Sequence, residues 1–170
     1  MSRIPPLLPG EVLRRVLRVA RFNGTSVLTV AAIFGLAAAM AHDQVDTVIG
    51  VLVAGTGALE LHGLGLLRHG QDRGVGWLVG SQLALLAVIL GYVLLRLGHV
   101  DVAPMRPFLT ADQLRVIAQS GLTTDEFLRM IYRLTYAVVG AVSVLYQGGL
   151  AFYYLRRRGP VGRALNEPAD

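Results

Sequence analysis

The chain contains no cysteine and no lysine, and only 16% of its 170 residues are charged. The absence of cysteine excludes disulfide bonds, thiolate metal sites and a cysteine nucleophile. A soluble domain normally carries about a quarter charged residues, so this chain has too few polar side chains to cover a water-exposed surface. Because 54% of the residues are hydrophobic, the composition instead predicts a single integral membrane domain over residues 1–170.

Positive charge comes from arginine alone, with 16 arginines and a net charge of +5. A basic chain can bind nucleic acid, but these arginines cluster at the ends of apolar segments. That placement is typical of side chains that meet anionic lipid headgroups. We therefore expect a lipid bilayer, and no nucleic acid, as the partner of the basic residues.

Four apolar segments approach the roughly 20 residues that an α-helix needs to cross a bilayer. They cover about residues 24–41, 45–67, 75–97 and 130–155. The sequence therefore predicts an all-α fold, a membrane bundle of four transmembrane helices. A loop at 98–123 joins the third and fourth segments, and a tail at 156–170 begins with three consecutive arginines.

The distribution of arginine predicts the orientation of the chain. Eleven arginines fall in the first 22 residues, the loop after the second segment and the tail, whereas five fall on the opposite side. The positive-inside rule then places both termini in the cytoplasm, and we expect a bacterial inner membrane. The competing interpretation is cleavage at Ala39–Ala41, which has the small-x-small pattern of a signal-peptidase site. The apolar run before it is longer than a usual signal core, which favours retention.

An amphipathic pattern occupies the N-terminal segment, residues 1–22. With about 100° between successive residues, apolar side chains at 12, 13, 16, 19 and 20 share one face. The opposite face carries Arg14, Arg15, Arg18 and Arg21. This pattern predicts a helix lying in the cytoplasmic interface with its arginines among anionic headgroups. The alternative is a cytoplasmic extension of the first span, but a natural bend at Asn23–Gly24 favours a separate helix.

The loop at 98–123 contains the signals of one short helix outside the membrane. Thr110 followed by Gln113 forms a capping box, and Gly121 provides a stop. We therefore expect an external helix over about residues 111–120. The sequence "TTDEF" then begins the last helix, with acidic residues in the first turn that complement the helix dipole.

A carboxyl side chain inside a membrane span is costly and requires polar partners. Glu60 lies about seven residues from the cytoplasmic end of the second span, or roughly 10 Å from it along the helix. Polar side chains of the other three spans fall at a similar depth, namely Thr29, Gln82 and Gln147. We therefore predict one intramembrane polar layer made of these four residues.

Two roles are open for Glu60. A buried acid that is hydrogen-bonded to amides can fix the register of neighbouring helices. Ionisable residues inside membranes also mark proton or ion pathways. The fourth span carries a polar stripe that includes Ser143, Tyr146, Gln147 and Tyr154. Ser143 and Tyr146 are therefore candidate contacts for a ligand or a pathway.

His62, four residues after Ala58 in the second span, is a candidate cofactor ligand. The spacing is similar to that of chlorophyll-ligating helices, and the imidazole could equally ligate haem. No second histidine lies at the same depth, so a hydrogen-bonded histidine between helices is the favoured interpretation. Histidines and aspartates in the outer turns fit solvated turn residues better than a metal site. We therefore expect no cofactor and no metal.

No catalytic motif accompanies these residues, since the sequence has no phosphate-binding glycine loop, no HExxH and no CxxC. The leading hypothesis is therefore a non-enzymatic membrane protein, either a helix-packing subunit of a larger complex or a self-associating scaffold. A stripe of small residues on the second span, from Gly50 to Gly65, supports helix association. The second hypothesis is a proton or ion pathway through Glu60 in a homo-oligomer. The third is a membrane enzyme or cofactor-binding subunit that uses His62.

Overall fold

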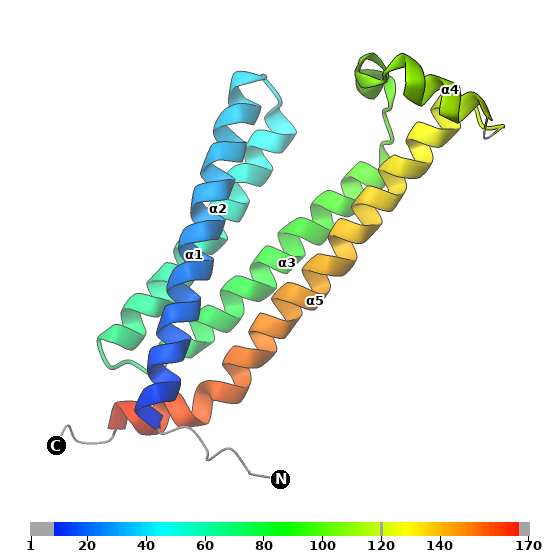
Figure 1. Cartoon of the computed structure of the whole chain (residues 1–170). Coiled ribbons are helices and arrows are strands. Elements are labelled where there is room, and N and C mark those ends of the chain that lie inside the picture. Colours follow the sequence, from blue (N-terminus) through cyan, green and yellow to red (C-terminus); the bar gives the residue numbers. More distant parts are fainter. Residues whose placement is uncertain (1–8, 120, 167–170) are drawn as a thin grey trace, which may run out of the picture. The chain divides into compact units, whose positions relative to one another are not determined.

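The computed structural model describes residues 9–119 and 121–166, and every regular element in this part of the chain is a helix (Figure 1). In chain order the elements are α1 (Pro9–Met40), α2 (Gln44–Arg68), α3 (Gly74–Gly98), the 3₁₀-helix η1 (Ala103–Phe108), α4 (Ala111–Gln119) and α5 (Thr124–Asn166). Within the described residues, α1, α2, α3 and α5 are long and apolar enough to cross a membrane. The prediction of an all-α chain with four potential membrane spans is confirmed.

The chain divides into two compact units. The first unit comprises Met1–Val88 and Val144–Asp170, and the second comprises Ile89–Ser143. Helices α3 and α5 therefore contribute residues to both units, whereas α1 and α2 belong to the first, and η1 and α4 to the second. Three parts of the predicted segments lie outside the described residues: positions 1–8, position 120 at the end of the predicted external helix, and positions 167–170.

Helix α1 is continuous from Pro9 to Met40, so the described residues contain no separate surface helix before Asn23. The apolar face of its first turns packs against protein. Val12, Val16 and Ala20 are 3%, 1% and 0% exposed and belong to the core of the first unit. The expected helix boundary at Asn23–Gly24 is therefore wrong, and the N-terminal turns extend the first span.

Helices α1 and α2 form a hairpin through a tight turn. His42 in this turn has a φ of 58°, and the Asp43 carboxylate accepts a hydrogen bond from the Asp46 N–H at 3.0 Å, which caps α2. Further along the hairpin, a Cβ at Gly50 would lie only 2.6 Å from the Cα of Gly35. Two residues of the small-residue stripe of α2, Gly50 and Gly57, thus serve close packing against α1 of the same chain.

Helices α2 and α3 also approach each other closely, next to the loop that joins them. A Cβ at Gly74, the first residue of α3, would lie 2.5 Å from the carbonyl oxygen of Gly63 in α2. Gly70 in the joining loop has a φ of 75°, a left-handed conformation that side chains disfavour. The first turns of α3 therefore lie directly against the last turns of α2.

The core of the first unit is built by four helices. Its buried members are Val12, Val16 and Ala20 of α1, Leu64 and Leu67 of α2, Val75 and Leu78 of α3, and Tyr154 and Val161 of α5. Helix α5 continues past the predicted end of the fourth span at the three arginines, as far as Asn166, with Pro160 inside it. Proline removes a helical hydrogen bond and kinks a helix, and Figure 1 shows α5 bending near this end. Val161 after the proline is fully buried in the core.

Two capping boxes organise the second unit. At the start of α4, the Thr110 N–H donates to Gln113 Oε1 at 2.8 Å, and the Gln113 N–H donates to Thr110 Oγ1 at 3.3 Å. At the start of α5, the Thr123 N–H donates to Glu126 Oε2 at 2.9 Å, and the Glu126 N–H donates to Thr123 Oγ1 at 3.3 Å. Gly121 between the two helices has a φ of 76°. The predicted capping box at Thr110 is confirmed.

The close approach at Gly50 predicts a large difference between two glycine substitutions in α2. Gly50→Ala should lower the free energy of unfolding by about 1–3 kcal/mol, because the new methyl group would overlap the α1 backbone. Gly55→Ala is the matched control, since a Cβ there meets nothing within 4 Å. It should be neutral or stabilising by up to about 1 kcal/mol through helix propensity. Thermal unfolding of the purified protein in detergent measures both changes, and equal effects would contradict the packing.

Candidate functional site

Glu60 lies in the last third of α2, and only 1% of its surface is exposed. Its two carboxyl oxygens accept hydrogen bonds from two other helices. The Asn23 amide of α1 donates to Oε2 at 2.6 Å, and the Tyr154 hydroxyl of α5 donates to Oε1 at 2.8 Å. One carboxyl group therefore joins three helices of the first unit.

A further hydrogen bond extends this arrangement. The Tyr146 hydroxyl of α5 donates to Asn23 Oδ1 at 3.1 Å. Asn23 thus uses both ends of its amide, with the nitrogen facing Glu60 and the oxygen facing Tyr146. The three bonds run from Tyr146 through Asn23 and Glu60 to Tyr154, and we call these four residues the Glu60 network.

The two glutamines of the predicted polar layer, Gln82 and Gln147, are also buried in the first unit. Their hydrogen bonding differs from that of Asn23 and Tyr154. Gln82 is 0% exposed and Gln147 is 7% exposed. The Gln82 amide is the third polar group that faces the Glu60 carboxyl group, although its contact lies outside the limits that the Asn23 and Tyr154 hydrogen bonds meet. Gln147 Oε1 is buried without a hydrogen-bond partner among the described residues.

Thr29, the fourth residue of the predicted layer, does not join it. Its side chain is exposed, and the α1 residue at Glu60 is Asn23 instead. Asn23 follows Val16 and Ala20 at spacings of seven and three residues, which places it on the same buried face of a continuous helix. That spacing was the sequence signal for Asn23, but the expected helix boundary at this position concealed it.

Tyr154 is the second residue of the Glu60 network that the predicted layer lacks. It belongs to the predicted polar stripe of the last span and lies seven residues after Gln147, which puts both on one helical face. Its hydroxyl reaches Glu60, and its ring is fully buried. The predicted polar stripe therefore included Tyr154, the α5 residue that bonds to Glu60. Counting residues from the assumed end of the span selected Gln147 instead.

The structure places the other candidate ligands differently. His62 is exposed, and its ring meets the edge of Trp77 with the two ring centroids 5.1 Å apart. Ser143 belongs to the second unit and is partly exposed. Tyr146 joins the Glu60 network through Asn23. Tyr146 is thus the candidate that the structure brings to Glu60 by a hydrogen bond to Asn23.

The four arginines expected at lipid headgroups all have exposed side chains on α1. These are Arg14, Arg15, Arg18 and Arg21. The opposite face of the same turns is occupied by the buried Val12, Val16 and Ala20. The helix is therefore amphipathic as predicted, but its apolar face is covered by protein.

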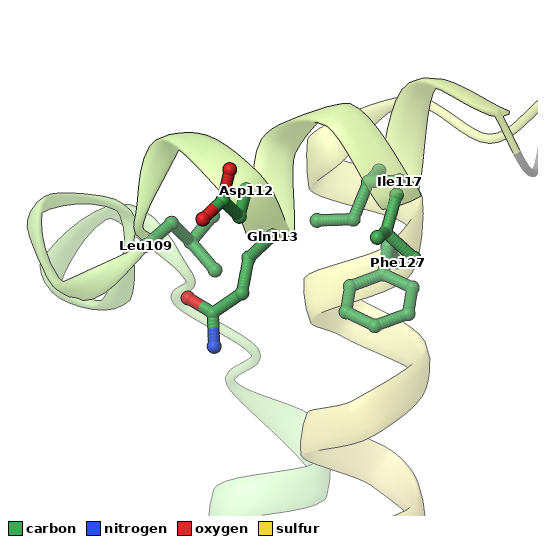
Figure 2. A pocket seen from close by; sticks show the side chains of 6 residues that line it. Leu109, Asp112, Gln113, Ile117 and Phe127 are labelled. Carbon is green, nitrogen blue, oxygen red and sulfur yellow. The ribbon is translucent and has the colours of Figure 1, made fainter.

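The second unit contains a separate pocket below α4 (Figure 2). It has a volume of about 290 Å³ and is lined by Leu109, Asp112, Gln113, Val116, Ile117 and Phe127. Figure 2 shows the side chains of Ile117 and Phe127 next to each other, and Ile117 is 3% exposed. The apolar walls explain how α4 packs on the first turns of α5. We regard this pocket as a packing feature and the Glu60 network as the candidate site.

The Glu60 network predicts a graded series of stability changes. Glu60→Leu should lower the free energy of unfolding by roughly 2–4 kcal/mol, because it leaves the Asn23 amide and the Tyr154 hydroxyl without an acceptor. Glu60→Gln should cost less, since one acceptor oxygen remains. Tyr154→Phe should cost about 1–2 kcal/mol.

Thr29→Val is the control for this series and should stay within about 0.5 kcal/mol of the unsubstituted protein, since the side chain is exposed. Thermal unfolding in a single detergent measures all four variants. A Glu60→Leu protein as stable as the unsubstituted one would show that the network does not hold the helices together.

Comparison of the chain with protein-family models, curated proteins and solved structures found no match. No residue role is therefore carried over from a relative.

Proposed function

We propose that this chain is a non-enzymatic integral membrane protein that serves as a helix-packing subunit or scaffold of a membrane complex. The observation that carries the proposal is the use of the Glu60 carboxyl group. Both of its oxygens accept hydrogen bonds from other helices, and within the described residues it forms no ion pair. A carboxyl group engaged in this way fixes the relative positions of helices, the role that a structural subunit requires.

The exposed apolar surface supports the same proposal. On α5, the side chains of Leu134, Val138, Leu145 and Phe152 are 58%, 51%, 77% and 59% exposed. Lipid chains or the helices of another subunit would cover such residues. Because the small-residue stripe of α2 is already used against α1, we propose that the partner helix contacts these larger apolar side chains.

The proposal includes a location and an orientation. Four helices that could span a membrane and the one-sided distribution of arginine favour a bacterial inner membrane with both termini in the cytoplasm. The exposed Arg14, Arg15, Arg18 and Arg21 would then lie at anionic headgroups. The segment with η1 and α4 would lie on the outer side.

A second candidate function is a proton or ion pathway in a homo-oligomer. The specific observation in its favour is the buried Glu60 carboxyl group itself, with the buried Gln82 amide facing it. Ionisable groups with polar neighbours also occur where ions or protons move through membranes. A membrane enzyme or cofactor-binding subunit that uses His62 is a third and weaker candidate, because His62 is exposed beside Trp77.

The proposed orientation predicts the result of reporter fusions. A reporter fused after Asp170 should be active in the cytoplasm, and a reporter inserted near Ala103 should be active on the opposite side, because one span, the fourth, lies between these two positions. The internal control is to place two reporters at each position, one that is active only in the cytoplasm and one that is active only on the opposite side. Signals from the same compartment at the two positions would contradict the four-span topology.

Purification in mild detergent and reconstitution in liposomes test the function. A scaffold or subunit should elute with a partner protein or as a defined oligomer, and its liposomes should show no pH-dependent flux. A pathway should give flux in the unsubstituted protein that Glu60→Gln abolishes, since glutamine neither binds nor releases a proton. A coloured preparation would support a cofactor bound to His62. Flux that survives Glu60→Gln would show that protons or ions do not pass through Glu60.

A further inference from the structure

We infer that α5 carries a binding site for one anionic phospholipid, formed by Phe152, Tyr153, Arg156 and Arg157, with the two arginines binding the lipid phosphate. The inference goes beyond the proposed function, because a bound lipid is compatible with a structural subunit and with a pathway. All four residues belong to the first unit. The site is distinct from the exposed arginines of α1, which are proposed to meet headgroups without selecting one lipid molecule.

The two arginines of this site are stacked on aromatic rings. The Arg156 guanidinium carbon lies 5.3 Å from the ring centroid of Phe152, and the Arg157 guanidinium carbon lies 5.7 Å from that of Tyr153. Each arginine comes one helical turn after its ring. Tyr153 in turn packs against the buried core of the first unit. Stacking restricts a guanidinium group and leaves the N–H groups at its edge able to donate to a ligand.

The N–H groups of these arginines are not used inside the protein. No hydrogen bond or ion pair within the described residues involves Arg156 or Arg157. Together with Phe152 and Tyr153 they line a hollow of about 490 Å³. Guanidinium groups bind phosphate oxygens through paired, charge-assisted hydrogen bonds. The hollow therefore has the charge and the donors that a phosphate group requires.

An apolar surface continues from this hollow along α5. Phe152 is 59% exposed, and Leu145, seven residues earlier on the same helical face, is 77% exposed. Between them lie Gly148 and Gly149, where a Cβ would meet nothing within 4 Å. Two consecutive residues without side chains leave open space between two large exposed ones. An acyl chain fits this space while its phosphate reaches Arg156, which shares the face of Phe152.

The combination of charge and apolar surface identifies the class of ligand. A phosphate ion or an acidic peptide would use the arginines and leave the apolar surface uncovered, whereas a phospholipid uses both. Helix α5 is apolar enough to cross a membrane, and arginines that directly follow an apolar stretch lie at the headgroups. The site thus assigns Leu145 and Phe152 to lipid, and leaves Leu134 and Val138 of the second unit to a partner helix.

Native mass spectrometry of the protein purified in a neutral detergent tests the inference, because each bound lipid adds its own mass. Dioleoyl phosphatidylglycerol should bind in a saturable way, with one molecule per chain at the tightest site. Dioleoyl phosphatidylcholine should bind about tenfold more weakly, because its choline group brings a positive charge to the arginines. Inorganic phosphate should not displace the phosphatidylglycerol, since it has no acyl chains to cover the apolar surface.

Three arginine variants separate a built site from general attraction to negative charge. Arg156→Gln and Arg157→Gln should each raise the dissociation constant for phosphatidylglycerol by about tenfold or more, because each removes charge-assisted hydrogen bonds to the phosphate. Arg158→Gln is the matched control, since it removes the same charge from an exposed neighbour that does not line the hollow. It should raise the constant by no more than about threefold. Equal effects of the three substitutions would overturn the inference.

Two further variants test the ring and the open surface. Phe152→Leu keeps an apolar side chain but removes the stacking, so it should weaken lipid binding by about threefold or more. Gly149→Leu should also weaken binding, because the new side chain fills the space of the acyl chain. Gly55→Leu in α2 is its control, since a Cβ there also meets nothing within 4 Å, and it should leave binding unchanged.

Three results would overturn the assignment to an anionic phospholipid. They are equal affinity for phosphatidylcholine and phosphatidylglycerol, displacement of the lipid by inorganic phosphate, and unchanged binding after Gly149→Leu. The co-purification and flux results test the proposed function separately.

Discussion

Placing a carboxyl group among apolar helices removes the water that would otherwise solvate it, and neighbouring groups must replace that water. Here the replacement comes from Asn23 and Tyr154, one from each of two other helices. Both helices must therefore approach α2 at the level of Glu60. Glycines such as Gly35 and Gly50 permit the approach of α1 along the same hairpin. The arrangement of the first unit thus depends on the solvation of one side chain.

Much of the fold could be predicted from composition and periodicity. Four long apolar runs led directly to the four potential spans, because the thickness of a bilayer sets the length of the helices that cross it. The capping box at Thr110 and Gln113 was predictable because it depends on residues three positions apart. Local signals of this kind need no knowledge of the neighbouring helices.

The candidate site could be predicted only in part, because its membership depends on how the helices are aligned with one another. Glu60 was selected for its cost in a membrane, and Gln82 for its similar depth in the third span. The depth of each residue in the membrane was counted from the assumed end of its span. For the first span this count selected Thr29 as the partner of Glu60, whereas the structure places Asn23 there. The error arose because α1 starts at Pro9, fourteen residues before Asn23, and continues through it. Tyr154 was missed because the estimate of depth selected Gln147, which lies seven residues earlier on the same face of α5.

The order in which the chain is synthesised gives the Glu60 network a further consequence. Asn23 precedes Glu60 by 37 residues, but Tyr154 follows it by 94. Helices α1 and α2 are synthesised before α5, so the Glu60 carboxyl group can bond to Asn23 before Tyr154 is available. Until α5 is made, the carboxyl group therefore has one of its two hydrogen-bond donors. The packing of the first unit is complete only when α5 has joined α1 and α2.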